Sequence, residues 1–140
     1  MKLSKNFSLS ELIATKTGLH NVPNQEQLKN LEQLVEHVIQ PARNIYGQPI
    51  EVTSGFRSAL VNTRVGGAAN SQHCKGEAVD LVCRNNAELF RIIRNMLTFD
   101  QLIWENGDDT EPDWVHVSYK PFGGNRREVF RYRNGKYEQF

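Results

Sequence analysis

Hydrophobic and polar positions follow a helical period early in the chain and again after its midpoint. After Asn24, apolar side chains recur every three or four residues as far as Ala42, which predicts one amphipathic helix capped by Asn24. Pro41 falls in the last turn of this helix and predicts a kink there. A second helix is expected over residues 87–97, with Asn86 as its cap.

A shorter helical segment is expected near the N-terminus. Ser8 and Glu11 have the spacing of a capping box just before the apolar pair Leu12 and Ile13, so a helix is expected to begin at Ser8. The polar segment that follows predicts that this helix ends near Gly18.

Alternating, β-branched runs dominate the rest of the chain and predict strands. They lie at residues 50–54, 78–82, 101–104 and 115–119. The tail predicts a hairpin, because two further runs flank Asn134 and Gly135. An Asn-Gly pair suits a type I′ turn, which needs positive φ at both central positions.

The order of these elements indicates an α+β fold, in which helices cover one face of a small, largely antiparallel sheet. The 140 residues fit one domain spanning residues 1–140, large enough to bury a core without a disulfide or metal. The longest irregular stretch, residues 63–71, leads directly to His73. Loops of that length are often functional.

Composition argues against several classes of partner. With 17 basic and 16 acidic side chains the formal charge is +1, so neither nucleic acid nor a membrane surface is expected as a partner. Cys74 and Cys83 lack the spacing of a redox pair and are expected to be reduced. No signal peptide and no long apolar segment is found, so we expect the protein to be made in the cytoplasm. A monomer is expected.

Two histidines and an aspartate have the residue types and spacing of a zinc site. Gly76 lies between His73 and Asp80, where it lets the chain turn from a loop ligand to a ligand on the following strand. His116 lies in an alternating run that places it on the same strand face as Trp114. One zinc ion is expected per chain, with its fourth position left to a water that titrates near pH ~7.

A carboxylate beside such a water can act as general base, and Asp113 is the candidate. It precedes His116 by three residues and is therefore tied to a ligand strand. The other nearby carboxylates, Glu105, Asp109 and Glu111, are less closely linked to a strand that carries a ligand.

Other residues near the expected ligands are candidates for binding substrate. Arg57 follows a predicted strand on a glycine turn, where its guanidinium can bind a substrate carboxylate or polarise the carbonyl under attack. Ser71 and Gln72 are expected to bind substrate or to orient the His73 ring. Trp114 is expected either to contact the substrate or to join the core.

These motifs resemble those of the zinc peptidases of bacterial cell walls, which include D-alanyl-D-alanine carboxypeptidases, vancomycin-resistance dipeptidases and phage L-alanyl-D-glutamate endolysins. The similar part runs from about Phe7 to Ser118. Residues 54–58 are similar to the family's Ser-Gly-aromatic-Arg-Ser segment, and residues 71–80 to its Ser-x-His-x-x-Gly-x-Ala-x-Asp motif. Trp114 to His116 resemble the strand that carries its third ligand.

The resemblance implies zinc ligation by His73, Asp80 and His116, acid-base catalysis by Asp113, and substrate binding by Arg57. It also implies the family's small α+β fold with the zinc site on an antiparallel sheet. The expected reaction is hydrolysis of peptidoglycan stem peptides, at either the D-Ala-D-Ala terminus or the L-Ala-D-Glu bond. Exo and endo cleavage both stay open, because Arg57 suits either substrate.

A catalytically inactive, zinc-stabilised module that binds wall fragments or a protein partner is the alternative function. The similar signalling domain of hedgehog proteins has such a zinc site and is not regarded as a working peptidase. Here the Asp113 and Arg57 positions are filled, which favours an enzyme. Without a signal peptide, such an enzyme is expected to reach the wall after host lysis or by export, which suits a phage or prophage origin.

Two further alternatives stay open at this point. Cys74 could replace the carboxylate in a His/Cys site, because thiolate is a better zinc ligand. The basic residues of the tail either attract an anionic wall polymer or form the solvated face of the hairpin.

Overall fold

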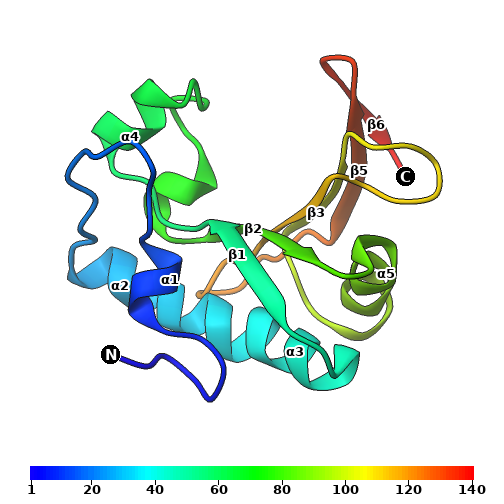
Figure 1. The fold of residues 1–140 in the computed structure, drawn as a ribbon, viewed down its shortest axis with the longest axis horizontal. Helices are drawn as coiled ribbons and strands as arrows, with labels where there is room; N and C mark the ends of the chain where they lie inside the picture. Colours follow the sequence, from blue (N-terminus) through cyan, green and yellow to red (C-terminus); the bar gives the residue numbers. More distant parts are fainter.

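Six strands form one sheet in the computed structural model, which describes residues 1–140 (Figure 1). Across the sheet the order is β1 (Ile50–Ser54), β2 (Ala78–Cys83), β4 (Trp114–Ser118), β3 (Gln101–Glu105), β5 (Glu128–Arg133) and β6 (Lys136–Gln139). Neighbouring strands are antiparallel except β3 and β5, which are parallel. The expected α+β fold with a largely antiparallel sheet is confirmed.

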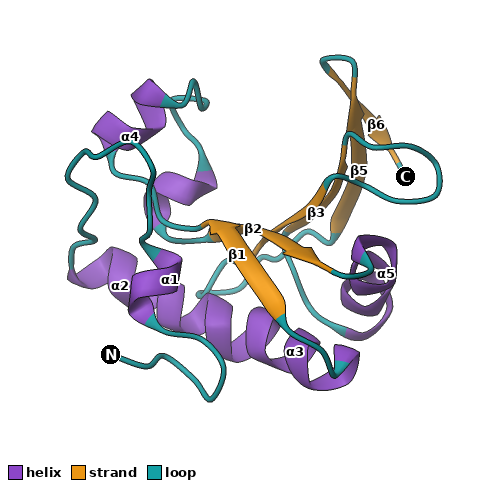
Figure 2. Ribbon diagram, in the orientation of Figure 1, coloured by secondary structure: helices purple, strands orange, loops and turns teal.

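Five α-helices accompany the sheet: α1 (Leu9–Leu12), α2 (Gln25–Leu34), α3 (Gln40–Tyr46), α4 (Ala59–Arg64) and α5 (Asn86–Met96). Figure 2 shows α2, α3 and α5 along one side of the sheet. None of these helices combines the length and the apolar character needed to cross a bilayer.

The predicted long helix exists, but a π-helical turn at Val35–Ile39 divides it into α2 and α3. Asn24 caps α2 as predicted, because its side chain accepts the Gln27 amide. The π turn lies directly before Pro41, where a kink was expected, and the Gln40 amide donates back to the Val35 carbonyl. A wider turn accommodates a proline, which has no N–H and whose ring crowds the preceding turn.

Two local predictions differ from the structure, and one helix was not predicted. α1 ends at Leu12 instead of near Gly18, and Asn21 then ties the returning chain to the carbonyls of Ile13 and Phe56. Asn85 rather than Asn86 caps α5. The short helix α4, capped by Ser58, was not predicted.

One face of the sheet forms the core with the helices. Alternate residues of the central strands point into it and are at most 3% exposed; they are Val79, Leu81, Leu102, Trp104, Val115 and Val117. They pack with the apolar stripes of α2, the π turn and α5. The intervening residues of these strands, which include Asp80 and His116, therefore lie on the opposite face of the sheet.

The hairpin predicted in the tail is confirmed. β5 pairs with β6, and Asn134 and Gly135 have φ values of 54° and 74° at the turn. Its arginines are engaged within the protein, since Arg131 and Arg133 both pair with Asp109, at 3.0 and 3.1 Å. These pairs argue against a free basic patch for a wall polymer.

Asp100 joins the tail to the turn that carries His73. It is fully buried, and Arg126 donates to its two oxygens at 3.0 and 2.8 Å. Gln72 donates to it at 3.1 Å. Burial alone would raise the pKa of Asp100, but the hydrogen bonds from Arg126 lower it to about 2.

We expect Asp100→Asn to lower the free energy of unfolding by about 2–3 kcal/mol at pH 7, because it removes a charged acceptor from a buried network. The folded-state pKa of Asp100 lies below its ordinary 3.8, so its contribution is present above that pH and is lost toward pH 2. Denaturant unfolding at pH 7 and pH 2.5 should therefore show a smaller difference at the lower pH. Glu128→Gln, which alters a more exposed partner of Arg126, is the control, and equal effects of both variants would contradict this role.

Candidate metal centre

His73 lies on a 3-10 turn, Gln72–Lys75, that leads into β2. Ser71 caps this turn, because its hydroxyl accepts the His73 amide at 3.2 Å. Gly76 ends the turn with φ of 76°, and a Cβ there would lie 2.5 Å from the carbonyl oxygen of Gln27 in α2. Glycine is therefore required here both by conformation and by close packing.

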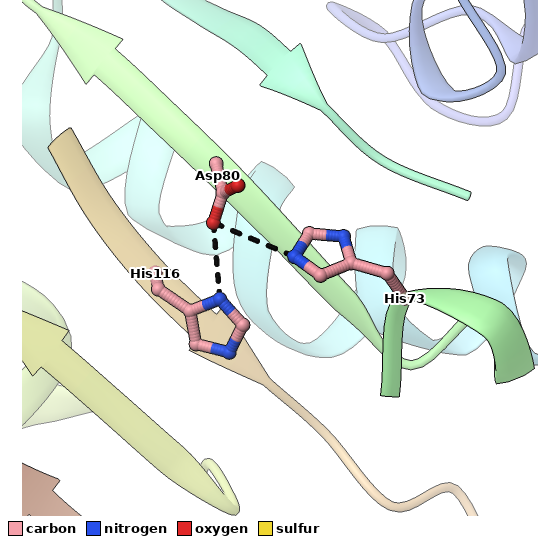
Figure 3. A group of neighbouring side chains, drawn as sticks. All are labelled: His73, Asp80 and His116. Carbon is pink, nitrogen blue, oxygen red and sulfur yellow. Dashed lines mark hydrogen bonds and ion pairs between the residues drawn. The ribbon is translucent and has the colours of Figure 1, made fainter. Parts of the chain in front are cut away.

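Asp80 and His116 are directly paired residues of β2 and β4, so their side chains leave the same face of the sheet. Both histidines point toward one oxygen of the Asp80 carboxylate (Figure 3). His116 Nδ1 lies 3.0 Å and His73 Nε2 lies 3.5 Å from Asp80 Oδ1.

The three side chains are largely shielded from solvent, with exposed fractions of 4% for His73, 12% for Asp80 and 14% for His116. Burial alone would raise the pKa of Asp80, but the adjacent His116 and His73 side chains hold it well below its usual range. Burial also lowers the pKa of His73. Charged carboxylate and neutral imidazole are the forms that bind a metal ion.

The donor atoms of His73, Asp80 and His116 fit a zinc ion, because they all lie within 4.8 Å of one another. Ligands at 2.0–2.1 Å in a tetrahedron are separated by about 3.3 Å, near the two distances to Asp80. His73 Nδ1 donates to the Gly55 carbonyl at 2.8 Å, which leaves Nε2 free as a ligand. Cys74 is not part of this group, and burial raises the pKa of its thiol.

Arg57 lies beside the ligands, on the turn after β1. Its Nη2 is 3.6 Å from Asp80 Oδ2, and its Nε donates to Ser54 at 3.1 Å. Its backbone amide donates to the His73 carbonyl at 3.1 Å. Arg57 thus occupies the place that the sequence predicted, with a guanidinium fixed at the edge of the centre.

A cavity of about 640 Å³ covers the metal-site face of the sheet. The three ligands and Arg57 line it, as do the predicted substrate-binding residues Ser71, Gln72 and Trp114. Lys120, Arg126, Tyr132 and Tyr137 also line it, although the sequence did not single them out for this site. They come from the tail, and only the tertiary fold brings them here.

Two carboxylates near the ligands have different surroundings. Asp113, the predicted base, is exposed and does not line the cavity, and its side chain makes no hydrogen bond. Glu105 is half-buried, lines the cavity and lacks a side-chain partner, and burial raises its pKa to about 7. The other rivals are engaged elsewhere, Asp109 by arginines and Glu111 by the Asn86 amide.

A bulge at the start of β4 explains why the sequence pattern was ambiguous here. Trp114 is the ladder partner of Glu105, yet the Asp113 amide also donates to the Glu105 carbonyl, at 2.9 Å. Two residues of β4 therefore oppose one residue of β3, as in a β-bulge. The side chains of β3 alternate regularly between the two sheet faces. Glu105 therefore lies on the same face as Ile103, the partner of His116.

Comparison with known proteins agrees with this geometry. Residues 5–118 match the peptidase M15 family. The chain belongs to this family. The candidate metal ligands His73, Asp80 and His116 all lie within the matched residues.

One relative of this M15 peptidase is the zinc D-Ala-D-Ala carboxypeptidase of Streptomyces albus G, which is 50% identical over 44 residues. The alignment covers 31% of this chain and only 17% of the length of that relative. The similarity therefore concerns a limited segment of both proteins.

We expect one zinc ion per chain and a loss of zinc affinity of more than about 100-fold in His116→Ala, because a ligand is removed. His37→Ala is the matched control, since His37 lies on the π turn outside the cavity. Cys74→Ser should retain zinc. Metal content and competitive chelator titration measure these effects, and zinc loss in Cys74→Ser with retention in His116→Ala would contradict the ligand set.

Proposed function

We propose that this M15 peptidase cleaves stem peptides of peptidoglycan, at the D-Ala-D-Ala terminus or at the L-Ala-D-Glu bond. The observation that carries the proposal is that three metal ligands, a fixed guanidinium and an unpaired carboxylate line one cavity. Its volume of about 640 Å³ suits a short peptide. We retain the expectation that the enzyme reaches the wall by host lysis or export.

The metal ligands and Arg57 have different roles in the proposed reaction. Zinc held by His73, Asp80 and His116 would polarise the scissile carbonyl and lower the pKa of a water in its open position. Arg57, oriented by Ser54, donates to the substrate carbonyl or to a terminal carboxylate.

Glu105 is the carboxylate that we assign as general base, in place of Asp113. It faces the cavity and has no competing partner, whereas Asp113 is exposed to solvent. A base with a pKa near neutrality can take a proton from the attacking water and return it to the leaving amine. The role of general base that the sequence predicted for Asp113 stays a prediction. The backbone of Asp113 lies opposite Glu105 at the bulge.

We expect Glu105→Gln to lower kcat by about 100-fold or more, because the isosteric amide cannot accept the proton. Asp113→Asn is the matched variant and should retain most activity. Both variants should bind zinc as the wild type does, which separates catalysis from metal loss. An inactive Asp113→Asn beside an active Glu105→Gln would return the role to Asp113.

Mass spectrometry of soluble products from purified peptidoglycan tests the reaction itself. Zinc-loaded protein should release products that are absent after chelation. Free D-alanine would identify a carboxypeptidase, and new N-terminal D-glutamate an endopeptidase. No product from walls of several chemistries, despite one bound zinc per chain, would contradict the proposal and support a zinc-stabilised binding module.

A further inference from the structure

Beside the metal ligands, four side chains form a row across four strands. Trp114 of β4 pairs with Glu105 of β3, Glu105 with Tyr132 of β5, and Tyr132 with Tyr137 of β6. Directly paired residues point to the same sheet face, and all four line the cavity. We call this set the aromatic row.

The aromatic row lies close to the bond that would be cleaved. Trp114 is two residues from His116 along β4, a separation of about 7 Å. An extended peptide covers that distance in about two residues. A group bound at the Trp114 end of the row is therefore attached near the scissile bond.

The row presents flat apolar faces with free polar groups. The Tyr132 and Tyr137 rings lie 4.6 Å apart, and Tyr137 is 62% exposed. The Trp114 indole N–H and both phenol groups have no hydrogen-bond partner in the protein, and Glu105 has none either. Aromatic side chains of this kind bind ligands that have one apolar side and one polar edge.

We propose that the aromatic row binds a pyranose ring of the wall glycan beside the cleaved bond. A pyranose offers C–H groups to the aromatic faces and hydroxyl groups to the indole and phenol groups. A primary ammonium is the other ligand that aromatic rings and a carboxylate can hold. The row extends over three strand spacings, about 14 Å, which is much wider than a cage around one ammonium.

The inference rests on the proposed function and narrows it. Stem peptides are joined to the glycan at their L-alanine end, so a sugar within about two residues of the cleaved bond favours the L-Ala-D-Glu bond. Tyr132 and Tyr137 lie beyond residue 118, where the match to the family ends. The hairpin β5–β6 thus supplies half of the row from outside the matched segment.

The test compares two stem pentapeptides ending in D-Ala-D-Ala, one carrying an N-acetylmuramoyl group and one an acetyl group at the N-terminus. We expect the wild type to prefer the muramoyl peptide by about tenfold or more in kcat/KM. Tyr132→Leu/Tyr137→Leu should bring this ratio near one while the acetyl peptide is still cleaved. Glu138→Gln, which alters the residue next to Tyr137 that pairs with Arg131, should keep the wild-type ratio.

Equal kcat/KM for both peptides, or an unchanged ratio in the double variant, would overturn the inference. If neither peptide is cleaved, the proposed function fails. Calorimetric Kd values of the same two peptides for zinc-loaded protein then test the inference, which requires tighter binding of the muramoyl peptide than of the acetyl peptide. A third peptide, containing Nε-acetyl-lysine in place of lysine, tests the ammonium alternative. A loss on lysine acetylation without a loss on sugar removal would assign the row to an ammonium and overturn the sugar assignment.

Discussion

The buried carboxylate of Asp80 is the constraint on which the rest of the site depends. Left without partners, such a charge would be strongly destabilising, so each neighbouring element must deliver a partner to it. His116 comes from the paired strand, His73 from the turn before β2, and Arg57 from the turn after β1. The tight turn at Gly76 and the register of β2 with β4 bring His73 and His116 to Asp80, so that the donor atoms of the three residues lie within 4.8 Å of one another.

Local signals explain how much of this arrangement could be predicted from the sequence. Alternation predicted the strands, and the Asn134-Gly135 pair predicted the hairpin, because both depend on neighbours in the chain. Residue type and spacing were sufficient to select His73, Asp80 and His116, which the fold brings within 4.8 Å of one another. The π turn before Pro41 and the early end of α1 depend on tertiary contacts that no local pattern contains. The different surroundings of Glu105 and Asp113 depend on a bulge and on the register between β3 and β4, which the sequence does not reveal.

The two parts of the cavity have separate origins in the chain. The segment that matches the M15 family carries the metal ligands, Arg57 and Glu105. The tail adds Tyr132 and Tyr137 of its hairpin to the cavity lining, and the Asp100–Arg126 pair attaches that tail beside the turn that carries His73. Under the proposed function, the matched segment supplies the bond-cleaving chemistry and the tail contributes to the choice of substrate.

A crystal structure of the zinc-loaded protein, with anomalous diffraction at the zinc edge, tests the central claim most directly. The account predicts one zinc peak about 2.0–2.2 Å from donor atoms of His73, Asp80 and His116, with the Glu105 carboxylate facing its open position. A peak ligated by Cys74, or an open position faced by Asp113 with Glu105 turned away, would contradict it.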